Sequence, residues 1–73
     1  MELELAIDDL ETEEAEELVR NALKDLTGIH GARIVRGGVH VIYNPLGVTP
    51  DEIIDEIRRC GFTVDTWQVT GQL

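Results

Sequence analysis

Apolar residues recur at every second position in some stretches of this chain and at every third or fourth position in others. This change of spacing limits the folds that the chain can adopt. Near the N-terminus, Leu3, Leu5 and Ile7 alternate with polar or small residues, which is typical of a half-buried strand. Residues 12–27 then carry apolar side chains at every third or fourth position, which predicts an amphipathic helix. Thr12 is a suitable N-cap for that helix.

The second half of the chain repeats the change of period. Two alternating stretches flank Gly37 and Gly38, and both glycines can take the positive φ that a tight hairpin needs. A second helix is predicted between its cap residue, Thr49, and Gly61, where it ends. A last strand is predicted over residues 62–69.

The predicted order is therefore β-α-β-β-α-β, within one domain that covers residues 1–73. Right-handed crossovers place both helices on one face of a four-stranded antiparallel sheet, which is the ferredoxin-like α+β sandwich. The apolar positions of the strands and helices give the expected core, which comprises Leu3, Leu5, Ile7, Leu18, Val19, Ala22, Leu23, Leu26, Ile34, Val39, Val41, Ile53, Ile54, Ile57, Phe62 and Val64.

The charge of the chain is strongly negative and unevenly placed. There are 15 acidic and 6 basic residues, a formal net charge of −9, and nine of the acids lie in the first 17 residues, which contain no base. Nucleic acid and anionic membranes attract clustered Lys and Arg, so neither is an expected partner. The sequence shows no secretory leader and no apolar run of membrane-spanning length, and it has a single cysteine. We therefore expect a cytoplasmic protein.

The order and spacing of the apolar and glycine residues resemble a known family. Over nearly the whole chain the sequence is similar to the heavy-metal-associated domains of copper chaperones, mercury-binding proteins and metal-pumping P-type ATPases. This resemblance implies the ferredoxin-like fold and a function related to the binding or transport of heavy metals. It is carried by Val19, Ala22, Leu23, Leu26, Gly28, Ile29, Val39, Val41, Tyr43, Asn44, Pro45, Ile53, Ile57, Gly61 and Phe62.

The resemblance does not extend to the metal-binding motif of that family. The family carries Met-x-Cys-x-x-Cys after the first strand, where two thiolates hold a soft ion such as Cu(I). Counting back from Val19 places the two cysteines at Thr12 and Ala15, and the Met position falls near Leu10. We therefore expect metal binding to be weak, rebuilt or lost. A soft ion such as Cu(I) remains a candidate cofactor, bound weakly or shared across a dimer.

The stretch DDLETEEAEE, residues 8–17, allows two interpretations. It could hold a hard cation such as Ca²⁺ through carboxylate oxygens, although it lacks the spacing of a calcium loop. It could instead be a solvated helix start, since acids in the first turn complement the helix dipole. We favour the second interpretation, in which this acidic stretch attracts a basic partner. The residues assigned to that surface are Asp8, Asp9, Glu11, Glu13, Glu14 and Glu17.

Cys60 is the one candidate metal ligand. The topology places the loop before the last strand at the same end as the first β-α loop, so Cys60 should lie near Asp9 and Thr12. Cys60 could contact a soft metal there, or it could be a small core residue at the end of the helix, as free cysteines often are. His30 is expected at the opposite end, so the two residues make no zinc pattern.

The uncovered face of the sheet is the second predicted contact surface. Strand parity assigns Ala6, Val35, His40, Ile42 and Trp67 to it. An apolar surface of this kind can mark a protein contact, or it can be the ordinary scatter of a small domain. No catalytic pairing or phosphate loop is present, so we do not expect an enzyme.

Two functions follow from these observations. One is a domain related to heavy-metal transport with a degenerate metal site. The other is a metal-independent protein-interaction module. The expected partner in either case is a protein with a basic surface, such as a metal-transporting ATPase or another heavy-metal-associated domain.

Overall fold

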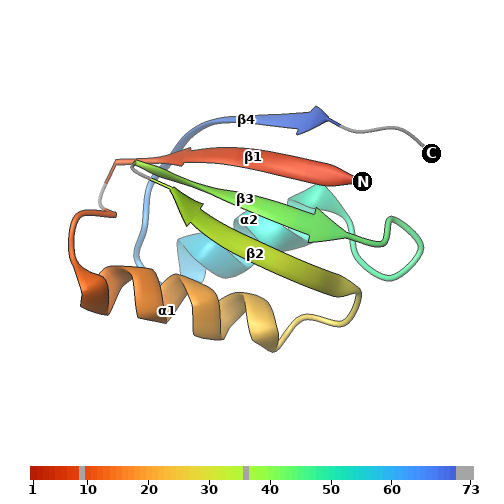
Figure 1. The fold of residues 1–73 in the computed structure, drawn as a ribbon, viewed down its shortest axis with the longest axis horizontal. Helices are drawn as coiled ribbons and strands as arrows, with labels where there is room; N and C mark the ends of the chain where they lie inside the picture. Colours follow the sequence, from red (N-terminus) through yellow and green to blue (C-terminus); the bar gives the residue numbers. More distant parts are fainter. Residues whose placement is uncertain (9, 36, 71–73) are drawn as a thin grey trace.

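The computed structural model describes residues 1–8, 10–35 and 37–70 and shows the predicted ferredoxin-like fold (Figure 1). The order is β-α-β-β-α-β, as the periodicity predicts. The elements are β1 (Glu2–Ile7), α1 (Glu13–Lys24), β2 (Ile29–Val35), β3 (Gly38–Tyr43), α2 (Pro50–Arg59) and β4 (Val64–Thr70).

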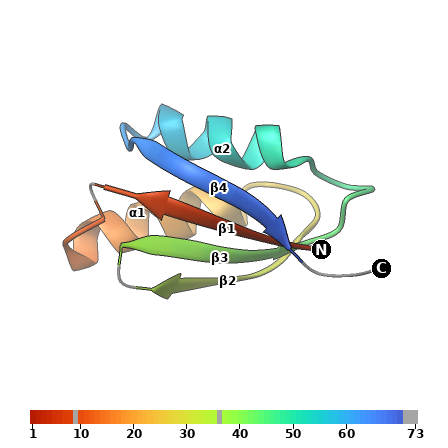
Figure 2. The same cartoon turned by 90° about the horizontal axis from the view of Figure 1, so that it is seen from above.

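The four strands form one antiparallel sheet in the order β2-β3-β1-β4. Both helices cover the same face of the sheet and leave the other face open (Figure 2). Helix α1 packs beside β2, and α2 packs beside β4. Within the described residues, β2 and β4 are therefore the two edge strands of the sheet, each paired on one side only.

The core lies between the sheet and the helices, and most of the predicted core residues are buried in it. Leu26, Ile34 and Val64 are only partly buried against it. The assignment of Leu18 was wrong, because this side chain is 53% exposed. It lies about a quarter turn from the centre of the narrow buried stripe of α1. The core also contains four residues that the prediction omitted, namely Leu10, Ala15, Tyr43 and Val48.

Side-chain caps fix the start of each helix where the sequence predicts. The Thr12 hydroxyl accepts a hydrogen bond from the Ala15 N–H at the start of α1. At α2, the Thr49 hydroxyl accepts from the Glu52 N–H and donates to the Glu52 carboxylate, so the two residues form a capping box. Helix α1 ends at Lys24, three residues earlier than predicted.

The β2–β3 hairpin needs glycine at two positions for different reasons. Gly37 has a φ of +77°, as predicted for a tight turn. Gly38 does not have positive φ, so the expectation for it was wrong. A Cβ at Gly38 would collide with the carbonyl oxygen of Leu5, because β3 passes close to β1 at this point. Gly38 is therefore required by close packing of the two strands.

Candidate functional site

Three loops meet at one end of the sheet, as the topology predicts. The Ile7 N–H donates to the Gly37 carbonyl at 2.9 Å, which joins the end of β1 to the hairpin. The Asp8 N–H donates to the Thr63 carbonyl at 3.4 Å, which joins it to the segment before β4. This end corresponds to the place where the resembled family holds its metal ion.

The residues at this end do not fit a two-thiolate metal site. Thr12 uses its side-chain oxygen to cap α1, at 3.1 Å from the Ala15 nitrogen. Ala15 is buried in the core and offers no ligand atom, and Leu10 is buried as well. A hydroxyl is also a hard donor, which suits Cu(I) badly. The two positions that would bear thiolates are therefore joined by a helix cap.

Two carboxyl groups, one just after β1 and one near the start of β4, lie close together. Asp65 raises the pKa of the Asp8 carboxyl above its ordinary value. The main cause is a side-chain hydrogen bond between the two groups, followed by desolvation and by the like charge of Asp65. Asp8 is exposed, so water screens much of this repulsion. No local sequence pattern indicates this pair, because the two residues are far apart along the chain.

The acidic stretch lies in the loop after β1 and the first turns of α1. Its carboxylates are exposed at Asp8, Glu11, Glu13, Glu14 and Glu17, while Asp9 lies outside the described residues. Among the residues that the structure describes, no three or more His, Cys, Asp or Glu side chains are grouped as metal ligands would be. The acids therefore surround a helix start without converging on one point.

Cys60 is the C-cap residue of α2, and its thiol is exposed. The alternative in which Cys60 fills the core is therefore wrong. Its backbone N–H bonds to the Ile57 carbonyl at 3.1 Å, and Gly61 follows with a φ of +95°. The thiol of Cys60 therefore lies at the exposed end of α2, two residues before Phe62 returns to the core. His30 is also exposed, in β2.

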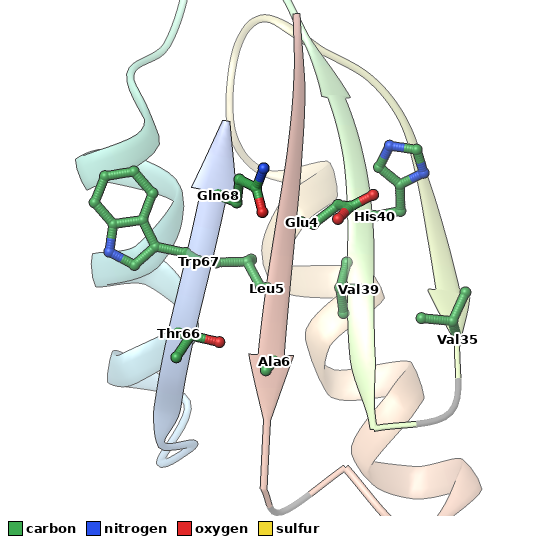
Figure 3. A pocket seen from close by; sticks show the side chains of 9 residues that line it. All are labelled: Glu4, Leu5, Ala6, Val35, Val39, His40, Thr66, Trp67 and Gln68. Carbon is green, nitrogen blue, oxygen red and sulfur yellow. The ribbon is translucent and has the colours of Figure 1, made fainter. Parts of the chain in front are cut away.

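The open face of the sheet is more polar than predicted. Its central row runs across the sheet through Arg33, His40, Glu4 and Gln68, which are partners in the strand register. Figure 3 shows three members of this row, Glu4, His40 and Gln68, at a shallow hollow of about 440 Å³. Charged and polar groups therefore interrupt the apolar surface around the 46% exposed Ile42.

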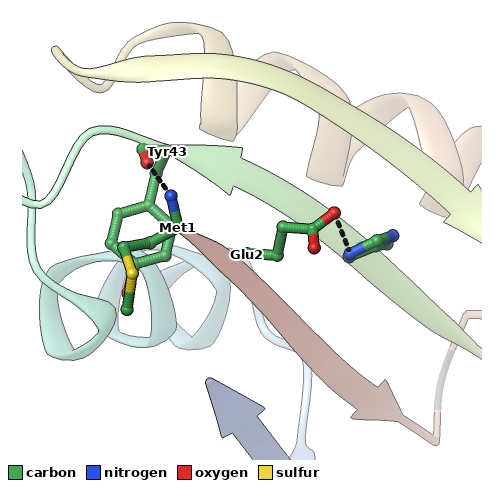
Figure 4. Close-up of polar contacts among 4 residues, drawn as sticks. Met1, Glu2 and Tyr43 are labelled. Carbon is green, nitrogen blue, oxygen red and sulfur yellow. Dashed lines mark hydrogen bonds and ion pairs between the residues drawn. The ribbon is translucent and has the colours of Figure 1, made fainter. Parts of the chain in front are cut away.

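His40 lies beside an acidic neighbour on this face. Its Nε2 lies 3.2 Å from Oε1 of Glu2, without the alignment of a hydrogen bond. Figure 4 draws this contact as a dashed line at the labelled Glu2. The same figure shows the Met1 amino group, which donates to the Tyr43 carbonyl at 3.1 Å. Met1 thereby extends the pairing of β1 with β3.

Trp67 does not belong to the open face, and the parity argument was wrong for it. Strand β4 has a bulge at which Ala6 pairs with Thr66 while Ile7 pairs with Val64, so Asp65 is an extra residue. Beyond the bulge, the inward and outward positions exchange. Trp67 pairs with the buried Leu5, so its side chain lies on the helix side of the sheet, at the outer edge of β4.

The predicted surface residues therefore occupy three separate places. The acidic stretch lies at the loop end and on α1, His40 and Ile42 lie on the open face, and Trp67 lies at the β4 edge. No single contact surface unites them. In the described part of the chain, no helix combines the length and the apolar composition needed to cross a membrane.

Comparisons with known proteins identify the class of fold. No protein-family model matches the sequence, and the search of curated proteins gave no match. Solved structures do match. The metallochaperone CopZ superposes with a TM-score of 0.85 at 22% identity, over 89% of this chain and 100% of that one.

Two transport-related domains match in the same way. The yeast copper transporter domain CCC2A, solved in apo and Cu(I)-loaded states, has a TM-score of 0.79 at 27% identity, over 88% of this chain and 90% of that one. A copper-binding domain of the P-type ATPase HMA7 has a TM-score of 0.80 at 18% identity, over 93% of this chain and 97% of that one. The chain thus has the fold of heavy-metal-associated domains, which confirms the resemblance found in the sequence.

Proposed function

We propose that this domain is a metal-independent protein-interaction module that retains the heavy-metal-associated fold. The observation that carries the proposal is the bond between Thr12 and Ala15. In the resembled family these positions bear the thiolates, whereas here they stabilise the start of α1. A chain that uses this loop as a helix cap has no pair of soft ligands with which to carry Cu(I).

The proposed partner is a cytoplasmic protein with a basic surface, such as a metal-transporting ATPase domain or another heavy-metal-associated domain. The exposed carboxylates of the acidic stretch support this choice. Fixed negative charge accelerates the encounter with a basic surface, and the acceleration weakens with salt. The fold neighbours, which include a chaperone and a domain of a transport ATPase, suggest the class of partner.

Competition for Cu(I) tests the loss of metal carriage. The reduced protein is mixed with Cu(I) and a strong colourimetric chelator, alongside a variant that carries Thr12→Cys and Ala15→Cys together. We expect the native chain to retain no stoichiometric Cu(I), and the double variant to gain retention because it restores two thiolates at the start of α1. Stoichiometric retention by the native monomer would refute the proposal.

Association kinetics test the acidic surface. The probe is a copper-chaperone domain with a net positive charge, titrated at several salt concentrations. The triple change Glu13→Gln, Glu14→Gln and Glu17→Gln should slow association at low salt and reduce its salt dependence. The matched control removes three charges elsewhere, through Asp25→Asn, Asp51→Asn and Asp55→Asn. Equal effects of the two triple variants would show that only net charge matters.

Calorimetry separates this role from a hard-metal site. The native chain and the Gln triple variant are titrated with Ca²⁺, Mg²⁺ and Zn²⁺. We expect no saturable binding at micromolar ion for either protein, because the carboxylates are exposed and do not converge. Saturable binding by the native chain that disappears in the triple variant would assign the acidic stretch to a cation.

A second candidate function follows from the exposure of Cys60. Two chains could each supply one thiolate to a shared soft ion, and Cu(I) accepts such a two-coordinate arrangement. This would restore metal binding in a dimer whose monomer lacks it.

A further inference from the structure

Strand β4 offers an unpaired edge with unusual composition. It is the outermost strand beside β1, and its regular part after the bulge reads Thr-Trp-Gln-Val-Thr, residues 66–70. This stretch contains no charge, glycine or proline, although the chain as a whole carries a net charge of −9. Trp67 is 48% exposed and Val69 is 36% exposed. Edge strands usually carry charges, prolines or bulges that prevent pairing with another chain.

The opposite edge of the sheet has the protection that this part of β4 lacks. The pairing of β2 with β3 is irregular between Ile29 and Gly31, so His30 interrupts the ladder. Arg33 adds a charge near the middle of the strand, where it is exposed. In β4 the bulge lies before the regular stretch, at Asp65, and leaves the following five residues uninterrupted. The two edges therefore differ in their capacity to accept another strand.

The β4 stretch is self-complementary when it is paired with a copy of itself. Its side chains follow the order Thr, large apolar, Gln, large apolar, Thr, which reads the same in both directions. With a two-fold axis at Gln68, each Trp67 faces Val69 of the second copy, and each Thr66 faces Thr70. Aromatic with β-branched pairs and Thr with Thr pairs are both stabilising across antiparallel strands. We propose that β4 pairs with β4 of a second copy of this chain, in this register.

The acidic stretch lies away from such a pair. The acidic stretch leads into α1, which packs beside β2, whereas α2 packs beside β4 (Figure 2). Pairing through β4 therefore places the two α2 helices next to the interface and keeps the two α1 helices apart. Trp67 and Val69 lie on the helix side, so they fill the space between the sheet edge and the neighbouring α2 helices. A two-fold pair also closes, so it gives a dimer and not a filament.

Sedimentation velocity over a range of protein concentrations tests the proposal. The full chain is studied with reductant and a chelator, so that Cys60 contributes neither a disulfide nor a metal bridge. We expect a monomer–dimer equilibrium that shifts toward dimer with added salt, because salt screens the repulsion between two acidic copies. A native chain that stays monomeric at millimolar concentration in high salt would overturn the proposal.

Paired lysine substitutions locate the interface. Val69→Lys places a charge at the β4 edge, and Ile42→Lys makes the same kind of change on the open face, where the side chain is 46% exposed. We expect the first variant to lose dimerisation and the second to dimerise like the native chain. Circular dichroism confirms that each variant is folded. Loss of the dimer in Ile42→Lys, or an equal effect of both changes, would place the contact elsewhere.

Charge exchange at Gln68 tests the register. A residue on the two-fold axis meets itself, so Gln68→Lys and Gln68→Glu should each weaken the dimer by about two- to fivefold through like charges. A mixture of the two variants should form heterodimers at least as readily as the native chain. If mixing gives no recovery, the two-fold axis does not pass through Gln68 and the proposed register is wrong.

Discussion

The Thr12 side-chain oxygen accepts a hydrogen bond from the Ala15 backbone N–H at 3.1 Å, and this bond spans the two positions that bear thiolates in the resembled family. The bond satisfies one of the free N–H groups at the start of α1. Ala15 in turn contributes its methyl group to the core. The loop thus retains its position in the fold while its side chains stabilise a helix.

Removal of this cap should destabilise the domain. Thr12→Ala leaves the Ala15 N–H without its side-chain partner, so we expect a loss of about 1 kcal/mol in the free energy of unfolding. Thr12→Ser keeps the side-chain oxygen, so its free energy of unfolding should fall much less. Urea denaturation of the three proteins measures the difference. Equal stability of the native chain and Thr12→Ala would show that the cap contributes nothing in solution.

Two leucines of α1 should respond very differently to truncation. Leu23 is fully buried, so Leu23→Ala should cost about 2–5 kcal/mol through lost contacts and a cavity. Leu18 is exposed, so Leu18→Ala should change stability by no more than about 0.5 kcal/mol. Thermal or urea unfolding compares them directly. A large loss at Leu18 would mean that a surface outside this chain, or a second copy, covers that leucine.

Local periodicity was sufficient to predict most of the fold. The change between alternate and helical spacing located all six elements, and Thr12 and Thr49 marked both helix starts. The errors arose where a pairwise contact decides the geometry. Parity failed at Trp67 because the bulge at Asp65 adds one residue to β4, and no local signal distinguishes a bulge from a regular strand.

The candidate site was only partly accessible to sequence reasoning. Topology correctly brought the β1 end, the hairpin and the segment before β4 together. The exposure of Cys60 depends on how the chain turns after α2, and the sequence allowed a buried or an exposed thiol. The contact between Asp8 and Asp65 depends on a register shift and could not be predicted for the same reason.

The Asp8 and Asp65 pair should make stability depend on pH. The pKa of Asp8 is raised above 3.8 in the folded protein, so the native state holds a proton that the unfolded chain releases more readily. The associated stability is fully present below pH 3.8 and is lost as pH rises through the raised pKa of Asp8. When Asp8 loses its proton, its new negative charge lies beside the like charge of Asp65, which opposes that ionisation.

Asp65→Asn should therefore raise the free energy of unfolding at pH 7. This gain over the native chain should shrink toward pH 3 and in high salt. Asp55→Asn removes an exposed acid from α2 and serves as the control. Urea denaturation at several pH values compares the three proteins. If Asp65→Asn gains no more free energy of unfolding than Asp55→Asn at pH 7, the carboxyl groups of Asp8 and Asp65 do not interact appreciably in solution.

The exposed thiol of Cys60 gives a prediction that is independent of the β4 edge. Ag(I) is a soft ion that two thiolates can bridge, so the reduced protein should dimerise when half an equivalent of Ag(I) is added. Cys60→Ser should abolish this dimer and leave any pairing through β4 intact, whereas Val69→Lys should leave the Ag(I) dimer intact. Light scattering after size-exclusion chromatography measures both. A native chain that elutes at the same mass with and without Ag(I) would exclude the bridged site and leave the domain without a route to soft-metal binding.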